Sequence, residues 1–261
     1  MRIFRLVWTY LHISITNELQ YRANFFIQLF QSLISLLVGL IGIELVFSQT
    51  TEIAGWTKTE LLTVLGVYML MGGIIHAYIQ PNMLRLMFEI QEGSLDFALT
   101  KPMDSQVIVS LREFHLWSFV DIALGLIIIG IAVSQNQVQI GLLQGLAFMM
   151  TLVLGAVILY CFWLMLSASA FWFIRVGEIA ELFEGIYSAG RWPVSIYPRW
   201  LRFGLTFIIP VAFAVTIPTE ALTNRLSIQS LVGAFLITIV LLSLTRMVWK
   251  LGTRNYSGAS S

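Results

Sequence analysis

Five polar residues in the second half of the chain follow the spacing of one helix face. They are separated by three, three, four and three residues: Glu178, Glu181, Glu184, Ser188 and Arg191. Residues three and four apart lie on the same side of a helix. The opposite side is expected to carry apolar residues, namely Ile179, Leu182, Phe183 and Ile186. An acidic stripe of this kind attracts cations and rejects anions, so the spacing predicts an amphipathic helix that favours positively charged molecules.

Two further carboxylates, Glu44 and Asp121, interrupt long apolar runs. One interpretation is that they are buried ionisable residues of an ion-driven transporter. The other is that each side chain reaches water at an interface, because Glu44 is near the end of its run and Asp121 is about two turns from the end of its own. We favour the second interpretation for both residues.

The sequence shows no constellation for catalysis. His12, His76 and His115 are far apart and have no local partner pattern, and Cys161, in an apolar run, suits a buried and inert thiol. Neither the phosphate-binding pattern G-x-x-x-x-G-K-[ST] nor the zinc pattern H-E-x-x-H occurs. We therefore expect a protein that is not an enzyme, with no catalytic residue, no metal site and no internal disulfide.

Composition identifies the medium in which these residues act. Of the 261 residues, 58% are hydrophobic and only 11% are charged, with 15 Lys and Arg against 14 Asp and Glu. Soluble domains contain about 45–50% apolar and about 25% charged residues, so this chain is expected to be an integral membrane protein. Its net charge of +1 gives no basic surface for nucleic acid.

Apolar runs long enough for membrane helices follow one another along the chain, since a bilayer core needs about 20 apolar residues. They cover 25–47, 61–79, 114–133, 140–174, 203–217 and 228–249. Residues 1–24 have the pattern of an interfacial helix. Lys and Arg are concentrated at both termini and in 81–113, and are rare in 48–60 and 134–139. The positive-inside rule then places both termini and 81–113 in the cytoplasm.

The stretch 140–227 allows two topologies. In the first, 140–174 is one long tilted span, 175–202 is cytoplasmic with Arg175 among its four arginines, and 203–220 spans outward. In the second, 140–174 holds one span and the start of another that continues to about Ala189, and 193–223 folds back into the outer leaflet. The distribution of positive charge favours the first, whereas four prolines in 193–218 favour the second.

The cytoplasmic segment 81–112 has the pattern of a lever. Pro81 suits a helix start, Gly93 suits a helix stop, Ser94 suits the cap of a second short helix over 95–100, and Pro102 ends that helix. A short rigid helix held between two spans can dock into a soluble partner and pass its motion to the membrane helices. An ordinary solvated loop is the alternative.

The chain resembles the permease subunits of type-2 ATP-binding cassette exporters. One motif, EGSLDFALTKP, is similar to the coupling segment of these permeases, and a second, RWPVSIYP followed by LTFIIP, is similar to their outer re-entrant region. The first motif contains the residues that the resemblance assigns to coupling with an ATPase: Glu92, Gly93, Ser94, Leu95, Asp96, Phe97, Leu99, Lys101 and Pro102. Leu95 and Phe97 are expected to enter an apolar groove of that ATPase.

The resemblance implies the second topology and a complete architecture. This is a single, all-α transmembrane domain over 1–261, with six spans, the interfacial helix 1–24, the coupling segment 81–112 and the outer re-entrant segment 193–223. The acidic stripe Glu178, Glu181, Glu184 and Ser188 would line the substrate path, and a cationic amphiphile or drug would be the exported substrate.

The same resemblance implies the partners. A separate nucleotide-binding subunit would bind ATP and Mg²⁺, so this chain would need no cofactor, and a second permease, identical or related, would complete the path in membrane lipid. The expected location is the plasma (inner) membrane of a prokaryote, with both termini in the cytoplasm. A secondary transporter driven by an ion gradient is the alternative function.

Overall fold

The computed structural model describes residues 2–20, 22–135, 141–173 and 177–256. Over these residues the chain forms helices, and the only extended pairing is an isolated bridge between Ile53 and Trp56. This confirms the all-α prediction. Five helical segments are long and apolar enough to cross a membrane: Ala23–Phe47, Lys58–Gln91, Leu116–Gln135, Leu142–Phe171 and Ile228–Asn255. A bent pair, Arg199–Ile208 with Ala212–Leu222, brings the possible number to six.

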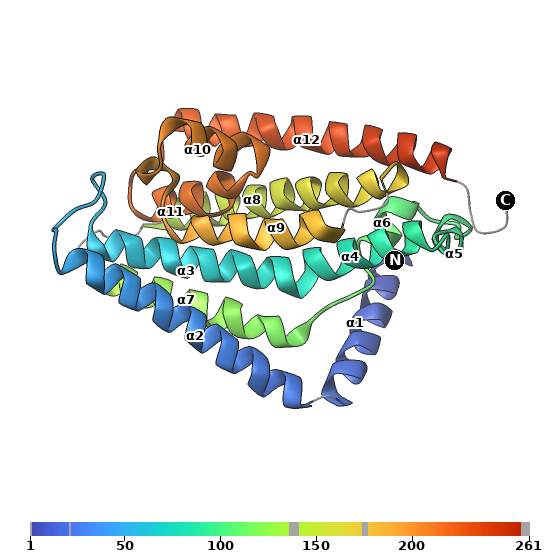
Figure 1. Cartoon of the computed structure of the whole chain (residues 1–261), viewed down its shortest axis with the longest axis horizontal. Coiled ribbons are helices and arrows are strands. Elements are labelled where there is room, and N and C mark those ends of the chain that lie inside the picture. Colours follow the sequence, from blue (N-terminus) through green and yellow to red (C-terminus); the bar gives the residue numbers. More distant parts are fainter. Residues whose placement is uncertain (1, 21, 136–140, 174–176, 257–261) are drawn as a thin grey trace.

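Most helices run along the long axis of the molecule, and α1 crosses that axis at one end (Figure 1). The long elements are α2 (Arg22–Phe47), α3 (Lys58–Ile74), α7 (Phe119–Gln135), α8 (Leu142–Ala168), α9 (Gly177–Tyr187) and α12 (Ile228–Asn255). The end that holds α1 (Arg2–Gln20) also holds both ends of the chain, and we call it the elbow end. The loop 48–57 marks the opposite end, which we call the turn end.

Glycines allow α3 and α7 to pack at very short distance. A Cβ atom on Gly125 would lie 2.6 Å from the backbone nitrogen of Leu70, and one on Gly66 would lie 3.0 Å from the carbonyl oxygen of Gly125. Small residues let membrane helices approach until their backbones touch. The two helices therefore form a rigid pair at the centre of the molecule.

The segment 193–223 begins and ends at the turn end. The indole nitrogen of Trp56 donates to Ser195 Oγ at 2.9 Å, and Arg225, just after the segment, donates to the carbonyl oxygen of Gly55 at 2.6 Å. Between these points the bent pair turns through 82°. Ser195 therefore lies at the same end as the loop 48–57, and the bent pair is, by its length and composition, either a broken span or the re-entrant segment of the second topology. Arg175 and residues 136–140 lie outside the described residues.

One feature of the other topology is nevertheless present. Leu142–Phe171 is one continuous helix of 30 residues, so 140–174 does not contain the start of the next span, as the re-entrant topology had predicted. The next helix, α9, runs from the elbow end towards the turn end, because its contacts on the long helix 58–91 move from His76 at Glu184 to Tyr68 at Tyr187.

Candidate functional site

The long helix Lys58–Gln91 passes through Pro81 without ending. Pro81 has no backbone N–H, so the carbonyl oxygen of Ala77 is released from the helix ladder, and it accepts a hydrogen bond from the backbone nitrogen of His115 at 2.8 Å. A π-helical turn, η1 (Ile75–Ile79), precedes α4 (Gln80–Gln91) at this point. Pro81 lies in the first turn of α4, as its pattern indicated, but α4 continues the preceding helix without a break, because a contact from a distant segment uses the carbonyl that proline frees.

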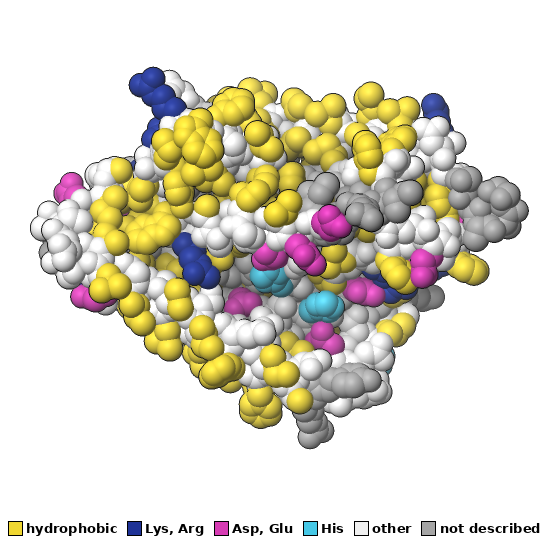
Figure 2. All heavy atoms as spheres, in the orientation of Figure 1, with side chains coloured by type: hydrophobic (Ala, Val, Ile, Leu, Met, Phe, Trp, Pro, Cys, Tyr) yellow, Lys and Arg dark blue, Asp and Glu magenta, His cyan; other side chains and the backbone are white. Residues whose placement is uncertain are grey.

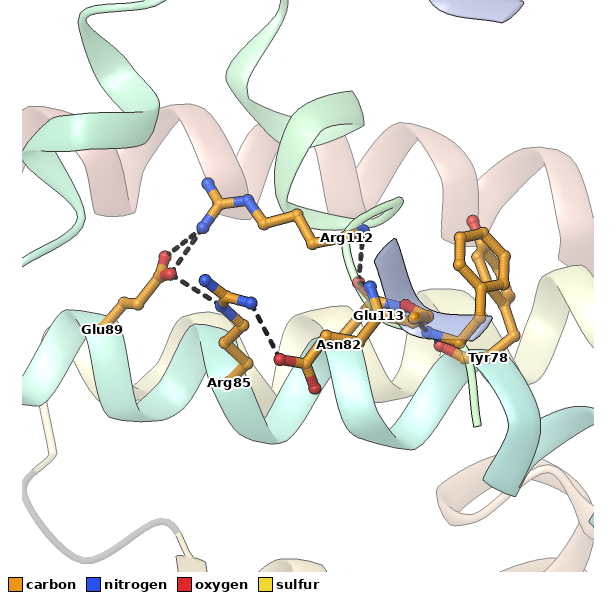
Figure 3. Close-up of polar contacts among 8 residues, drawn as sticks. Tyr78, Asn82, Arg85, Glu89, Arg112 and Glu113 are labelled. Carbon is orange, nitrogen blue, oxygen red and sulfur yellow. Dashed lines mark hydrogen bonds and ion pairs between the residues drawn. The ribbon is translucent and has the colours of Figure 1, made fainter. Parts of the chain in front are cut away.

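Asn82 of α4 holds the segment at Arg112 and Glu113 against this helix (Figure 3). Its side-chain oxygen accepts from the backbone nitrogens of Arg112 and Glu113 at 2.7 and 3.0 Å. Its side-chain nitrogen donates to the carbonyl oxygens of Tyr78 and Glu113 at 2.7 and 2.8 Å. One buried side chain thus satisfies four backbone groups, and it fixes where the chain re-enters the helix bundle.

An ion-pair ladder extends this attachment along α4 (Figure 3). Glu89 accepts from Arg112 Nη1 at 2.5 and 2.6 Å and from Arg85 Nε at 3.0 Å, and Arg85 Nη1 donates to Glu113 at 2.8 Å. The side chains of Arg112 and Glu89 are only 8% and 12% exposed. Sequence reasoning did not find this ladder, although the spacing of Arg85 and Glu89 by four residues was a signal for part of it.

The tip of the segment agrees closely with the predicted lever. Gly93 has φ of 73°, the left-handed conformation that favours glycine, and it ends α4. The short helix is α5 (Asp96–Leu99), within the predicted 95–100, but Ser94 does not cap it. A second short helix, α6 (Ser105–Val109), follows with Asp104 as its N-cap, and the sequence analysis did not predict it. We call residues 92–110 the elbow.

The first and last helices both hold the elbow. Lys101 Nζ donates to the Tyr10 hydroxyl of α1 at 3.2 Å, and the Tyr256 hydroxyl, just after α12, accepts from the backbone nitrogen of Leu95 at 3.1 Å. Arg246 of α12 binds Asp104 through both terminal nitrogens. The hydrogen bond from Arg246 holds the pKa of Asp104 below its usual range. These contacts connect the elbow to both α1 and α12.

Burial separates the predicted coupling residues into two groups. Leu95 is fully buried within this chain, so the expectation that it enters a groove of a partner was wrong. Phe97 is 78% exposed on the same short helix, and Glu92, Lys101 and Pro102 are also exposed. Asp96, Leu99, Gly93 and Ser94 are partly exposed. The only apolar side chain that protrudes fully from α5 is therefore that of Phe97.

The acidic stripe lies on α9, as predicted, and acidic and histidine side chains gather in the middle of the face that Figure 2 shows. Glu184 Oε1 is 3.1 Å from His76 Nε2, whereas Glu178, Glu181 and Ser188 are exposed. Leu182 and Ile186 lie on the apolar side of the helix, as predicted, and are 65% and 38% exposed, whereas Phe183 and Tyr187 are buried. Ile179 has no described side chain.

A polar cavity of about 190 Å³ lies beside this stripe. It is lined by Gln28, Gln31, Ser32, Ser35, Tyr68, Met69, Gly72, His76, Asp121 and Tyr187. Gln28 Nε2 donates to Asp121 at 3.0 Å, and Arg191 Nη2 donates to Ser35 at 3.2 Å while its guanidinium lies over the ring of Tyr68. The acidic stripe and the cavity together form one polar surface built by α2, α3, α7 and α9.

The remaining sequence candidates have simpler environments. Glu44 pairs with Lys58 at 2.5 Å near the turn end, and both side chains are well exposed, which agrees with its interfacial interpretation. Asp121 is partly buried in the first turn of α7 and lines the cavity. Cys161 is buried, as expected. The backbone of His115, rather than its ring, makes the contact described above.

Comparison with protein families gives one match. The family described as ABC-2 family transporter protein matches residues 33–260, which is most of the chain. No curated protein and no solved structure matches the chain.

Proposed function

The chain belongs to the ABC-2 family of transporter proteins, and from this premise we propose that it is one of two permeases of an ATP-driven exporter. The family is a membrane component of ABC transporters, and the long apolar helices agree with a multi-pass membrane protein. ATP and Mg²⁺ would be bound by the partner ATPase, and the second permease would be either a copy of this chain or a related one.

The exposed Phe97 carries the proposal for coupling. It projects from a short helix in the elbow. The elbow is held by the hydrogen bond from Lys101 to Tyr10 of α1 and by the ion pair between Asp104 and Arg246 of α12. A single apolar side chain on a rigid support is suited to insert into a groove of a soluble partner. Because the support is tied to α12, a displacement of Phe97 by the ATPase would be transmitted into the membrane helices.

The test is the substitution Phe97→Asp, which places a charge in the proposed groove. We expect normal abundance in the membrane but loss of co-purifying ATPase and of transport, whereas Phe97→Leu should retain both. Leu95→Asp is a useful contrast, since it introduces a charge into the core and should lower abundance itself. Normal ATPase association in the Phe97→Asp protein would place coupling elsewhere.

We further propose that the elbow end and both termini are cytoplasmic, in the plasma membrane of a prokaryote, with 193–223 facing outside. Single cysteines in a Cys161→Ser background test this orientation with an impermeant thiol reagent. Arg199→Cys and the loop control Glu52→Cys should be labelled in intact cells, because both positions are exposed at or near the turn end. Phe97→Cys should be labelled only after the cells are opened; the reverse pattern would refute the orientation.

The acidic stripe supports a cationic amphiphile as substrate. Glu178 and Glu181 are exposed on α9 beside the apolar Leu182 and Ile186, so this surface offers negative charge and apolar area together. A lipid-facing position would be costly for these carboxylates, at about 2.5–3.5 kcal/mol for a midplane charge on the lower scale. The second permease would then face this surface and enclose the path.

One observation favours the alternative of a secondary transporter, namely that the ionisable residue Asp121 lines a cavity. The two functions are separated by measuring export with ATP after the proton and sodium gradients have been collapsed. Export that continues with ATP alone supports the ABC exporter, and export that requires the gradient supports the alternative.

A further inference from the structure

We propose that the polar cavity between α2, α3 and α7 binds the head group of a monovalent organic ammonium ion, with Asp121 as its counter-ion. This inference rests on the proposed function, because it assigns the substrate class to a particular site on the path. It differs from the acidic stripe of α9 in position, in chemistry and in the residues that a test would change.

Asp121 is a carboxylate in the first turn of α7, and it has no cationic partner among the ion pairs of the described residues. Its Cβ lies 3.1 Å from where a Cβ on Gly73 would be, so it lies against the long helix Lys58–Gln91. Its hydrogen bond comes from the neutral amide of Gln28, and no lysine, arginine or histidine within the described ranges forms an ion pair with it. Ionisable groups inside membrane proteins pair with one another or face a water-filled cavity, so a cation that enters this cavity would supply the counter-charge that Asp121 needs.

The neighbouring charges do not remove this need. Glu184 is bonded to His76, and Arg191 is held by Ser35 over the ring of Tyr68. The surroundings of the cavity therefore contain two carboxylates, one guanidinium and one histidine that is already bonded to a carboxylate. A single positive charge beside Asp121 would balance the set when His76 is neutral.

Ser32 supplies an independent indication of a ligand. It lines the cavity, is only 2% exposed, and its hydroxyl has no hydrogen-bond partner among the described residues. Several other helical hydroxyls in this chain donate to the carbonyl one turn earlier, as those of Thr63 and Thr151 do. A buried hydroxyl without a partner costs about 1–3 kcal/mol. The hydroxyl of Ser32 is therefore available for a group that enters the cavity.

Size and ligand type restrict what this group can be. Pockets that enclose a whole drug-sized molecule measure about 300–1,000 Å³, so a cavity of about 190 Å³ suits a head group rather than a complete amphiphile. A divalent metal ion would need six or more oxygen ligands, and Asp121 is the only carboxylate in the lining. An alkyl tail could leave along α2, where Ile27, Ile34 and Val38 are exposed.

The experiment measures binding of decylammonium, whose N–H groups can donate to both Ser32 and Asp121, to the full chain in lipid nanodiscs without an ATPase. Decan-1-ol, which has the same tail and no charge, is the control ligand. We expect the cation to bind at least about tenfold more tightly than the alcohol, and Asp121→Asn to remove that difference, since tenfold corresponds to about 1.4 kcal/mol. Asparagine can still accept the hydrogen bond from Gln28, so the fold should be retained.

Two further variants make the test specific. Ser32→Ala should weaken binding of the cation by a smaller factor of about threefold, because one unpaired hydroxyl is removed and no charge changes. Glu52→Gln, which removes a carboxylate from the exposed loop 48–57, should have no effect. Equal affinity for the two ligands, or unchanged cation affinity in a folded Asp121→Asn protein, would overturn the proposal. Because no ATPase is present, neither result depends on the coupling role of Phe97.

Discussion

The elbow and the polar surface of α2, α3, α7 and α9 use similar residues in opposite ways. At the elbow and along α4, charged side chains such as Arg112, Glu89 and Asp104 are paired with partners in the same chain. On the polar surface, Asp121 has no ion pair, the Ser32 hydroxyl has no hydrogen bond, and Glu178 and Glu181 are exposed. Paired polar groups fix a shape, whereas unpaired ones remain available to a ligand or a second subunit.

The largest effect should come from breaking the ladder beside the elbow. Glu89→Ala leaves the buried guanidinium of Arg112 without its carboxylate. Removing one partner of a buried ion pair costs about 3–5 kcal/mol, so we expect a fall of about 3 kcal/mol in the free energy of unfolding. The measurement is reversible unfolding of the purified protein in a fixed detergent and lipid mixture.

Glu113→Ala is the matched control for this change. Glu113 pairs with Arg85, but their side chains are 35% and 44% exposed, and exposed ion pairs contribute about 0.2–1 kcal/mol. The control should therefore cost less than 1 kcal/mol. Equal effects of the two substitutions would show that burial of Arg112 does not matter, and the contrast between the two regions would lose its physical basis.

A smaller effect is expected where α7 packs closely against α3. Gly125→Ala would force α7 away from α3, since the new Cβ would lie 2.6 Å from the nitrogen of Leu70. Overpacking of this kind costs about 1–3 kcal/mol. Gly145→Ala is the control, because nothing lies within 4 Å of the corresponding Cβ position, and it should leave the unfolding free energy unchanged or raise it by up to about 1 kcal/mol, since alanine is a better helix former than glycine. An unchanged unfolding free energy in the Gly125→Ala protein would show that α3 and α7 are not rigidly packed.

Local patterns in the sequence were sufficient for the features that depend on neighbouring residues. Gly93 could be predicted as a helix stop because few other residues adopt a positive φ, and the spacing of Glu178, Glu181 and Glu184 was sufficient to place them on one side of α9. The family motif around Phe97 was sufficient to locate the elbow. In each case the signal lies within about one or two turns of helix.

Features that depend on distant contacts could not be predicted in this way. The helix passes through Pro81 because the carbonyl of Ala77 is satisfied by His115, which is 38 residues later in the sequence. Asp121 meets Gln28 across 93 residues, and Glu184 meets His76 across 108. Periodicity reports which side of a helix is polar, but it does not report which helix that side faces. For this reason the sequence did not indicate that Asp121 shares a cavity with Gln28 and His76.

The smallest effect on stability should come from the acidic stripe, where the effect on transport should be large. Glu178→Gln combined with Glu181→Gln preserves shape and removes two charges that are exposed. Substitutions at such surface positions usually change the unfolding free energy by less than about 0.5 kcal/mol. If the stripe attracts the substrate, export of an organic cation should fall while ATPase association and abundance stay normal.

Export of a cation and of a neutral analogue, measured in the same membrane vesicles, separates loss of attraction from loss of the transport cycle. If the stripe is only a solvated surface, the double substitution should leave both exports unchanged. If the stripe supports the fold, the double substitution should lower the abundance of the protein. Only the selective loss of cation export agrees with the contrast between a region that holds its shape and a region that leaves its charges for another molecule.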